Sequence, residues 1–530
     1  MFYLFLFIIS LFLTALATLG VKKLAIFLKV IDWPDKTGEG RKIHKQGIPL
    51  LGGLGIFVIY FALLFIFSNR FLAGDLNFSH LLAFFLGALV IVIGGALDDK
   101  YNLAPQKQII FPLLAIALLI FGGVGIERIS NPFGGQIDLG SFAFISQGLL
   151  IVWLLGMMYT TKLLDGVDGL VSGVGAIGAL VIFLFTLTTR YFQPDIALAA
   201  VLLLGSLSGF LIFNWHPAKI FLGEGGSLLI GYILGVLAII SGGKIAIALL
   251  VMGIPVLDVL WTIFRRILQG KNPWRFADKK HLHHRLLNLG LTQRQTVLVF
   301  FAFSSIFGIS GLFLQSRGKF FALLVLALIM IIIVIVFNYL DRRFVSAKPK
   351  LLLHVCCAPC SSYITRDILS SRYQVIWYFY NSNLNTLQEY KKRLMAVKMV
   401  ASRFNIPLIV EPYKHPAWLE KVKGREADLE CGPRCQICYF DRLFQTAKMA
   451  KKKKIKIFST SLLVSPYKNT ELIGEIGKKL ALEYELEFLA ENFQANDGYR
   501  LSQNLAKELG LYRQKFCGCE FSFRPEKKAI

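Results

Sequence analysis

The sequence predicts two domains of different fold class: a polytopic α-helical membrane domain over residues 1–340 and a soluble α/β domain over 350–530, joined by a linker at 341–349. Hydrophobic residues make up 55% of the 530 residues, more than an ordinary soluble protein contains. Long apolar runs stop before residue 340, and all eight cysteines lie after it, between Cys356 and Cys519. Composition and cysteine usage therefore change at the same point of the chain.

About eleven apolar runs of near membrane-spanning length fill the first domain. They lie roughly at 2–21, 51–68, 80–97, 108–123, 146–160, 169–189, 196–213, 225–240, 245–264, 296–314 and 320–339. No basic residue precedes the first run, so we expect a retained span and not a cleaved signal peptide. The protein is therefore expected to cross the lipid bilayer of the cell membrane many times.

Lysine and arginine residues are unevenly divided between the loops that alternate along these spans. One set of loops contains most of them, including Lys22, Arg41, Arg265 and Lys280. The other set contains only Arg70, Arg128, Arg190, Lys244, Arg317 and Lys319. Because positively charged loops stay in the cytoplasm, this distribution predicts an N-terminus outside the cell and a cytoplasmic C-terminal domain.

Acidic and histidine residues gather at the predicted cytoplasmic ends of the spans: Asp98, Asp99, Asp165, Asp168, Glu224, His281, His283 and His284. A carboxylate inside a span costs about 2.5–3.5 kcal/mol, so several acids on one face indicate a function. Carboxylates can hold Mg²⁺, which often bridges substrate phosphates, and basic or histidine side chains can neutralise a nucleotide. The sequence therefore predicts phosphoryl transfer from a nucleotide donor to a lipid acceptor at the membrane surface.

The order of these motifs resembles the polyprenyl-phosphate N-acetylhexosamine-1-phosphate transferases of glycosyltransferase family 4. The motifs are Arg41-Lys-Ile-His44, Gly52-Gly53, Asp98-Asp99-Lys100, Asp165-Gly-Val-Asp168-Gly, Asn214, Phe221-Leu-Gly-Glu224-Gly-Gly-Ser227 and His281-Leu-His-His284. The resemblance covers the whole first domain. It implies transfer of a sugar-1-phosphate, with GlcNAc-1-phosphate expected, from a UDP-sugar to undecaprenyl phosphate with Mg²⁺ as cofactor.

The same resemblance implies roles for individual residues. Catalysis is assigned to Asp98, Asp99, Asp165 and Asp168, and Mg²⁺ binding to Asp168 and Glu224. Substrate binding is assigned to Lys100, Asn214, His281, His283, His284 and Arg285. Lys162 is expected either to bind a substrate phosphate directly or to displace the metal. The chain departs from the family pattern at Glu224, where Asp is usual, and at Tyr159 and Lys162, where Asn is usual. We expect these departures to affect metal geometry and sugar specificity.

The second domain alternates predicted strands and helices. Strands are expected at 351–355, 375–380, 407–410 and 455–460, and helices at 359–370, 387–404, 439–450 and 471–482. This order predicts a Rossmann-like, three-layer domain with a parallel sheet. Sites in such sheets form at the carboxyl ends of the strands. We therefore expect the segments after three strands to meet: Cys356-Cys357, Asn381-Ser-Asn383 and Thr460-Ser461.

Cysteines form three groups along the second domain: Cys356-Cys357 with Cys360, Cys431 with Cys435 and Cys438, and Cys517-Gly-Cys519. Structural disulfides are rare in the cytoplasm, so metal binding or redox chemistry is favoured. Four thiolates from two loops could hold zinc or an iron–sulfur cluster. A disulfide across a Cys-Gly-Cys segment would be strained and easily reduced, as catalytic disulfides are.

The same residues lie in motifs that resemble the QueH-type epoxyqueuosine reductases. The motifs are Leu353-His-Val-Cys356-Cys357-Ala-Pro-Cys360, Tyr378-Phe-Tyr-Asn381-Ser-Asn383, Arg434-Cys435-Gln-Ile-Cys438, Ser465-Pro-Tyr-Lys468 and Tyr512-Arg-Gln-Lys-Phe-Cys517-Gly-Cys519. The resemblance implies that an electron donor supports removal of the epoxide oxygen from epoxyqueuosine in tRNA. It also implies a [4Fe-4S] cluster on Cys356, Cys357, Cys435 and Cys438, and a redox-active pair formed by Cys517 and Cys519.

Basic residues outnumber acidic ones in the second domain, with 30 Lys and Arg against 18 Asp and Glu from Lys350 onward. This excess suits an RNA partner. We expect contacts to tRNA phosphates from Lys391, Lys392, Arg393, Arg500 and Arg513. The run at 451–454 could complement a helix dipole or contact a membrane surface.

The leading hypothesis is a bifunctional enzyme that combines a lipid-linked sugar-1-phosphate transferase with a tRNA epoxyqueuosine reductase. The alternative is an inactive membrane anchor that carries a zinc- or cluster-stabilised tRNA-binding module. Iron content distinguishes the two for the second domain, because a zinc-loaded domain would not be a reductase of this kind.

Overall fold

The computed structural model describes residues 1–33, 46–74, 76–131, 133–139, 142–188, 192–241, 245–268, 270, 281–514 and 516–522. The chain divides into two compact units, Met1–Phe337 and Asn338–Ile530. The motif residues Arg41 and His44 lie outside the described part of the chain.

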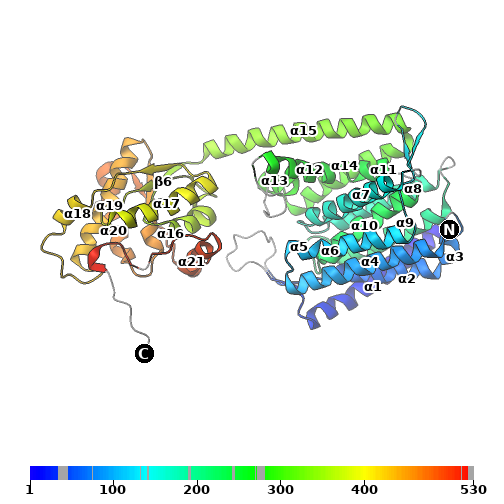
Figure 1. Ribbon diagram of the computed structural model, residues 1–530, viewed down its shortest axis with the longest axis horizontal. Coiled ribbons are helices and arrows are strands. Elements are labelled where there is room, and N and C mark those ends of the chain that lie inside the picture. The colour runs from blue at the N-terminus through cyan, green and yellow to red at the C-terminus, as the bar shows by residue number, and fades with distance from the viewer. Residues whose placement is uncertain are drawn as a thin grey trace. The chain divides into compact units, whose positions relative to one another are not determined.

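The first unit is built from helices that run alongside one another (Figure 1). They are α1 (Phe2–Phe27), α2 (Gly52–Ile66), α3 (Ser68–Phe71), α4 (Phe78–Tyr101), α5 (Pro105–Gln108), α6 (Ile110–Phe121), α7 (Ala143–Leu164), α8 (Leu170–Thr186), α9 (Pro194–Asn214), α10 (Gly223–Ile240), α11 (Ile245–Val251), α12 (Gly253–Leu268), α13 (Leu282–Asn288), α14 (Gln293–Phe313) and α15 (Ser316–Ala347). Two short antiparallel pairs join them, β1 (Ile31–Asp32) with β2 (Ile48–Pro49) and β3 (Arg128–Ser130) with β4 (Gln136–Asp138).

Seven of the described helices are long and apolar enough to cross a membrane, namely α1, α4, α7, α9, α10, α14 and the part of α15 at Ser316–Tyr339. The pair α11 and α12 passes the same test together but is bent by 82°. Shorter apolar helices occur at Gly52–Ile66, Pro105–Phe121 and Leu170–Thr186. These helices fit a membrane domain, and eleven complete crossings remain a prediction.

Exposed apolar side chains on the outside of the bundle support this reading. Phe121 and Phe144 are 88% and 89% exposed, which suits a lipid environment better than water. In α15 the buried side chains Leu326, Met330 and Val334 recur every four residues, whereas Ile331 and Ile335 are exposed. One face of this helix therefore packs on the bundle and the opposite face is left for lipid.

Glycine residues allow the start of α10 to approach its neighbours closely. A Cβ atom on Gly53 of α2 would lie 2.1 Å from the Cα atom of Gly226, and one on Gly95 of α4 would lie 2.0 Å from the Cα atom of Gly225. Three helices can therefore meet almost backbone to backbone at this point. The contact places Glu224, in the first turn of α10, next to the end of α4.

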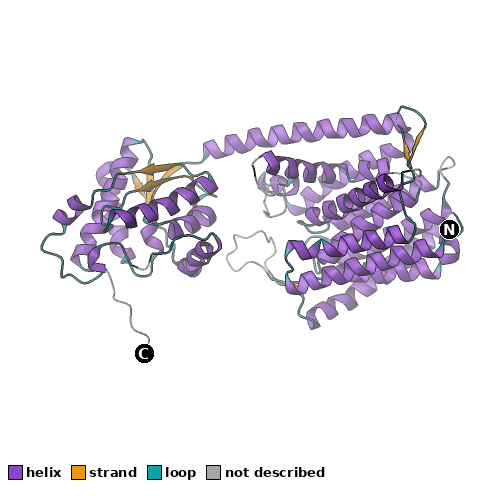
Figure 2. Ribbon diagram, in the orientation of Figure 1, coloured by secondary structure: helices purple, strands orange, loops and turns teal. Residues whose placement is uncertain are grey.

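The second unit contains a five-stranded parallel sheet (Figure 2). Its strands are β5 (Lys350–His354), β6 (Gln374–Phe379), β7 (Leu408–Val410), β8 (Ile457–Thr460) and β9 (Glu487–Phe488), in the order β7-β6-β5-β8-β9. Leu351, Leu352 and Leu353 alternate between the two faces of the sheet and are all fully buried. Both faces are therefore covered, and the predicted parallel sheet is confirmed.

The helices of this unit are α16 (Ala358–Tyr363), α17 (Leu387–Phe404), α18 (His415–Lys421), α19 (Pro433–Lys452), α20 (Thr470–Tyr484) and α21 (Gly498–Glu508). The helix predicted at 359–370 is instead α16 followed by a π-helical segment at Ile364–Leu369. Helix α19 begins earlier than predicted, and α18, β9 and α21 were not predicted. Helix α18 and strand β9 are too short to carry much hydrophobic periodicity, whereas α21 is an amphipathic helix of 11 residues that the prediction overlooked.

Candidate functional sites

Asp99, near the end of α4, lies against the start of α10. Its Oδ1 atom accepts a hydrogen bond of 3.0 Å from the backbone N–H of Glu224. A Cβ atom on Gly223 would lie 2.3 Å from Asp99 Oδ2, and the backbone of Gly223 has a positive φ of 75°. The position therefore requires glycine, and the carboxylate of Asp99 faces the positive end of the α10 dipole.

A chain of polar contacts joins Asp98 to Glu224. Asp98 Oδ1 accepts hydrogen bonds from Leu103 N at 2.7 Å and from Gln108 Nε2 at 3.1 Å. Gln108 Oε1 in turn accepts one of 2.9 Å from Lys162 Nζ. The same ammonium group lies 2.9 Å from Glu224 Oε2. We call Asp98, Asp99, Gln108, Lys162 and Glu224 the acidic network; it gathers three of the predicted acids around one lysine.

Asp168 lies in the loop between α7 and α8 and is held by other groups. Its Oδ2 atom is 2.7 Å from His216 Nδ1 and accepts a hydrogen bond of 3.1 Å from Ala218 N. Asn214 is buried, accepts hydrogen bonds from Gly169 N and Ser172 Oγ, and donates one to Ile220 O. These hydrogen bonds fix the loop that carries Asp168. A contact between Asn214 and the substrate remains a prediction.

The histidine motif packs against the opposite side of that loop. A Cβ atom on Gly166 would lie 2.6 Å from His283 Nε2, so His283 lies beside the exposed Asp165. The rings of His281 and His283 are stacked, with centroids 5.7 Å apart. His281 Nδ1 is 2.8 Å from Asp258 Oδ2, and Asp258 Oδ1 accepts a hydrogen bond of 3.0 Å from Leu282 N.

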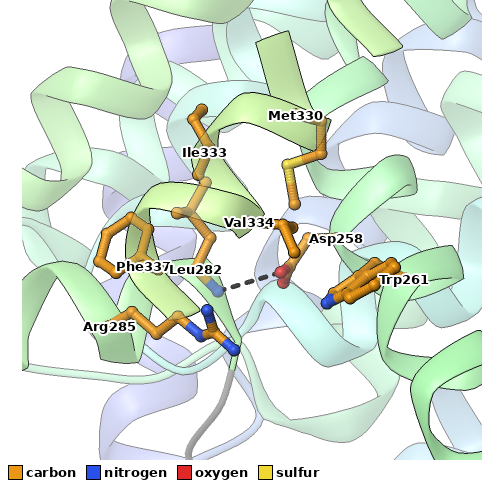
Figure 3. Close-up of a pocket in the computed structure, with 8 residues that line it drawn as sticks. All are labelled: Asp258, Trp261, Leu282, Arg285, Met330, Ile333, Val334 and Phe337. Carbon is orange, nitrogen blue, oxygen red and sulfur yellow. Dashed lines mark hydrogen bonds between the residues drawn. The ribbon is translucent and has the colours of Figure 1, made fainter. Parts of the chain in front are cut away.

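Figure 3 shows Asp258 at a small pocket beside the histidine motif. The pocket is lined by Asp258, Trp261, Leu282, Arg285, Met330, Ile333, Val334 and Phe337. Arg285 is buried, and its guanidinium carbon lies 5.7 Å from the centre of the Phe337 ring. The α15 side chains in this group are apolar, so the polar end of the pocket comes from α12 and α13.

The predicted residues of the first unit thus lie in separate groups and not in one cluster. Asp168 and Glu224, the two predicted Mg²⁺ ligands, have different partners. Lys100 is exposed beside the ring of Tyr101, and His284 is buried next to His283. Sequence reasoning missed Gln108, His216 and Asp258. Asp258 offered a signal, because a lone carboxylate inside the apolar run at 245–264 is costly unless it has a partner.

The acidic network offers oxygen donors of the kind that Mg²⁺ prefers, although Asp168, one of the two expected ligands, lies outside it. Within the described residues, no three His, Cys, Asp or Glu side chains are grouped closely enough to hold a metal ion as they stand. The network nevertheless offers the carboxylate oxygens that this hard cation prefers, from Asp98, Asp99 and Glu224. Lys162 Nζ lies among these groups and balances part of their negative charge.

The second candidate site lies at the carboxyl ends of β5, β6 and β8. Cys356, just after β5, donates a backbone hydrogen bond of 3.1 Å to Ser461 Oγ, just after β8. Asn381, after β6, donates one of 3.0 Å to Val355 O. The Sγ atoms of Cys356 and Cys357 are 3.8 Å apart. The three segments meet because parallel strands place their carboxyl ends at one edge of the sheet.

Helix α19 brings Cys435, Cys438 and Arg442 to the same edge on successive turns. Burial raises the pKa of the Cys438 thiol to about 12. Arg442 is also buried, and it donates a hydrogen bond to Asn383 Oδ1. Burial by itself lowers the pKa of Arg442. Interaction with the nearby sulfur groups of Cys438, Cys517 and Cys356 raises it by more, so the pKa of Arg442 is raised overall. A permanent cation therefore lies among thiols from three segments.

The thiol donors of these groups suit an iron–sulfur cluster, although among the described residues no three of the cysteines are yet close enough together to ligate one. All eight cysteines are free thiols, and Cys357, Cys435 and Cys438 are buried. Within the described residues Arg442 Nε is buried and has no hydrogen-bond partner. A buried, incompletely paired guanidinium is costly alone but suits an anionic group held by thiolates. The arrangement is thus compatible with a cluster on Cys356, Cys357, Cys435 and Cys438.

Different surroundings distinguish the two cysteines of the Cys-Gly-Cys segment. Lys468 Nζ lies 2.9 Å from Cys517 Sγ and 3.2 Å from Glu430 Oε1. Cys519 instead packs in an apolar cluster with Trp418, Val422, Cys438 and Phe521. An ammonium group next to a sulfur stabilises its thiolate, whereas apolar packing does not. The structure therefore places a polar partner at Cys517 only.

The prediction that Arg393 contacts tRNA phosphate is wrong. Arg393 is 3% exposed and forms an ion pair of 2.7 Å with Glu389, which also accepts a hydrogen bond from Tyr512. Its remaining N–H groups donate to the carbonyl oxygens of Cys517 and Phe516. Arg393 thus holds the backbone of the Cys-Gly-Cys segment. The other residues expected to contact tRNA phosphates are exposed, namely Lys391, Lys392, Arg500 and Arg513.

Comparison with known proteins identifies both units. The family described as "Glycosyl transferase family 4" matches residues 81–242, and "Epoxyqueuosine reductase QueH" matches residues 351–525. A probable undecaprenyl-phosphate N-acetylglucosaminyl 1-phosphate transferase of Bacillus subtilis is 33% identical over 337 residues, which cover 62% of this chain and 90% of that protein.

The second unit is similar to known epoxyqueuosine reductases over most of their length. The epoxyqueuosine reductase QueH of Thermotoga maritima is 39% identical over 186 residues, covering 34% of this chain and 93% of that protein. The QueH of Streptococcus pyogenes is 34% identical over 183 residues, covering 33% of this chain and 71% of that protein. The chain therefore belongs to two enzyme families, the polyprenyl-phosphate GlcNAc-1-phosphate transferases in its first part and the QueH epoxyqueuosine reductases in its second.

Proposed function

We propose that the chain is a bifunctional enzyme. Residues 1–340 transfer GlcNAc-1-phosphate from UDP-GlcNAc to undecaprenyl phosphate at the cytoplasmic membrane face. Residues 350–530 reduce epoxyqueuosine to queuosine in tRNA, and residues 341–349 link the two parts. In this arrangement the N-terminus is outside and both active sites face the cytoplasm, where nucleotide sugar, tRNA and an electron donor are available.

The acidic network is the observation that best supports the transferase. A phosphate oxygen of the lipid attacks the phosphorus that carries the sugar, a new P–O bond forms, and the P–O bond to UMP breaks. Asp98 accepts the proton of the lipid phosphate as a general base, and Asp99 contributes to the binding of metal or lipid phosphate. Lys100, Lys162, His281, His283, His284 and Arg285 contact the donor, and Asp165 helps to position it. Asp168 and Glu224 would hold Mg²⁺, which would neutralise the donor phosphates.

Transfer into lipid tests this activity. Membranes that contain the protein are supplied with Mg²⁺, undecaprenyl phosphate and UDP-GlcNAc labelled in the sugar, and butanol-soluble label is measured. We expect label in the lipid fraction with the wild-type chain and none with Asp99→Asn. Absence of labelled lipid across several UDP-sugars, while the reductase is active, would reject the transferase assignment and support an inactive anchor.

The convergence of thiols from three segments is the observation that best supports the reductase. Cys517 and Cys519 supply two electrons and two protons as they become a disulfide. The epoxide oxygen leaves as water, and the two epoxide carbons become the alkene of queuosine. An external electron donor returns the disulfide to two thiols. Cys356, Cys357, Cys435 and Cys438 would hold a [4Fe-4S] cluster, which would supply low-potential electron transfer beside the substrate.

Iron content and nucleoside analysis test this half. Protein purified without oxygen should be brown and contain about four iron atoms per chain, as a [4Fe-4S] cluster requires. Wild-type protein with a reductant should convert epoxyqueuosine in tRNA to queuosine. Cys519→Ser should keep the iron and lose the conversion. Zinc in place of iron, with no conversion, would instead support a tRNA-binding module.

A further inference from the structure

Exposed lysines gather at the amino edge of the parallel sheet. Lys451 and Lys452 form the last turn of α19, Lys453 and Lys454 follow it, and Lys456 precedes β8. Lys478 and Lys479 lie on α20, which packs against α19, and Lys451 Nζ is 2.5 Å from Glu485 Oε2 at the end of α20. We call these seven exposed lysines the basic edge: Lys451, Lys452, Lys453, Lys454, Lys456, Lys478 and Lys479.

We propose that the basic edge, together with Leu482, is a docking surface for an anionic phospholipid membrane. The two lysines in the last turn of α19 also complement the dipole of that helix, but the dipole effect ends there and leaves the other five unexplained. Lysine clusters near a membrane attract anionic headgroups, and the attraction is strong only within about a Debye length of the surface.

An exposed leucine favours lipid over RNA as the partner. Leu482 on α20 is 84% exposed. It is three residues from Lys479 and four from Lys478, so the three side chains are neighbours on one helical face. Exposed Glu483 and Glu485 also flank Leu482, but an apolar side chain beside two lysines suits an interface where acyl chains lie beneath charged headgroups. A phosphate backbone offers nothing to such a side chain.

Sheet topology separates this surface from the thiols. All five strands are parallel, so the segments that lead into them share one edge and the segments that leave them share the other. Lys456 comes directly before β8, and Ser461, which contacts Cys356, comes directly after it. Lipid at the basic edge would therefore leave the edge with Cys356 and Cys435 accessible to tRNA.

The covalent linkage to the last candidate span enters the second unit at this same edge. The apolar part of α15 ends at Tyr339 and β5 begins at Lys350, so ten residues separate the end of a candidate span from the amino end of the central strand. Even fully extended, ten residues reach no further than about 35 Å. The chain enters this sheet at its amino edge, which is the edge that carries the lysines.

Lysine labelling of the full-length protein in lipid nanodiscs tests the proposal, whichever face the second unit occupies. Discs of phosphatidylcholine are compared with discs that contain about 30% phosphatidylglycerol, an anionic fraction that attracts polybasic segments. A water-soluble amine-reactive ester is added, and modification is followed by mass spectrometry. Lys391 and Lys392, exposed at the start of α17 and near the carboxyl ends of the strands, are the reference residues.

We expect labelling at 451–456 to slow at least about threefold in anionic discs and to recover near 1 M salt, where the Debye length is only about 3 Å. Labelling of Lys391 and Lys392 should be the same in both discs. Equal labelling of the basic edge in the two discs would overturn the proposal. Protection by added tRNA without protection by anionic lipid would also overturn it and identify an RNA surface.

Two variants test which side chains are responsible for the protection. The variant with Lys451→Gln, Lys452→Gln, Lys453→Gln and Lys454→Gln should lose the protection of the remaining Lys456, Lys478 and Lys479 in anionic discs. It should keep its KM for tRNA in detergent, and a several-fold rise in that KM would contradict the proposal. Leu482→Ser should weaken the protection, whereas Leu429→Ser, which alters an equally exposed leucine near Cys431, should not.

Discussion

Lys162 Nζ lies 2.9 Å from Glu224 Oε2, so the structure joins two of the three positions at which the chain departs from the transferase pattern. Glu224 extends further than the usual aspartate by one methylene, and Lys162 places a cation where the family has asparagine. Lys162 also donates a hydrogen bond to Gln108, which contacts Asp98. The two departures therefore form one coupled change within the acidic network.

This coupling predicts that the two positions are not independent. Lys162→Asn and Glu224→Asp should each lower kcat/KM for UDP-GlcNAc about tenfold, equal to about 1.4 kcal/mol of transition-state stabilisation. The double variant, which has the usual residues at these two positions, should regain most of the activity. A double-mutant cycle on transfer rates measures the coupling, and strictly additive losses would show that the pair does not act together.

Gly223 should be intolerant of any side chain. Gly223→Ala adds a Cβ atom 2.3 Å from Asp99 Oδ2. The backbone at this position is left-handed, a conformation that costs about 1–2 kcal/mol for residues other than glycine. We expect transferase activity to fall more than about tenfold. Gly156→Ala in α7, where a Cβ atom meets nothing within 4 Å, is the matched control and should be neutral. Equal effects of the two changes would refute the requirement.

Asp258 should act through His281. Asp258→Asn keeps the hydrogen bond from Leu282 N but removes the carboxylate that fixes the His281 ring. We expect kcat to fall at least about tenfold with a small change in KM for UDP-GlcNAc, as for loss of an oriented histidine. The control is Asp195→Asn, which changes another buried aspartate, at the start of α9. A parallel loss in both variants would indicate a general packing effect.

Arg393 should stabilise the second unit through its buried ion pair. Arg393→Met leaves Glu389 buried without its cation, which costs about 3–5 kcal/mol in comparable pairs. We expect earlier unfolding of this unit in urea, measured by pulse proteolysis, and partial recovery on adding Glu389→Leu. Lys392→Met changes the exposed neighbour and should leave the midpoint unaltered. A midpoint unchanged by Arg393→Met would show that the pair contributes nothing.

Much of this organisation could be predicted from residue order. Long apolar runs have no soluble alternative, so every predicted span is helical, although the run at 245–264 forms two helices, α11 and α12, bent by 82°. The alternation of strands and helices after Lys350 was enough to predict a parallel sheet, because connections of that length bring strands back in the same direction. The family assignments also followed from short motifs whose order and spacing could be read directly.

What the sequence alone determined is the division into two parts, the two enzyme families and a set of candidate residues for the chemistry. The tertiary structure decided which of those residues meet. Two of these contacts, Lys162–Glu224 and Asp258–His281, join residues on different elements. The third finding is that Arg393 is buried, although its sequence context is typical of an exposed residue. Local periodicity reports on one element at a time, so contacts that depend on packing between elements become visible only in the folded chain.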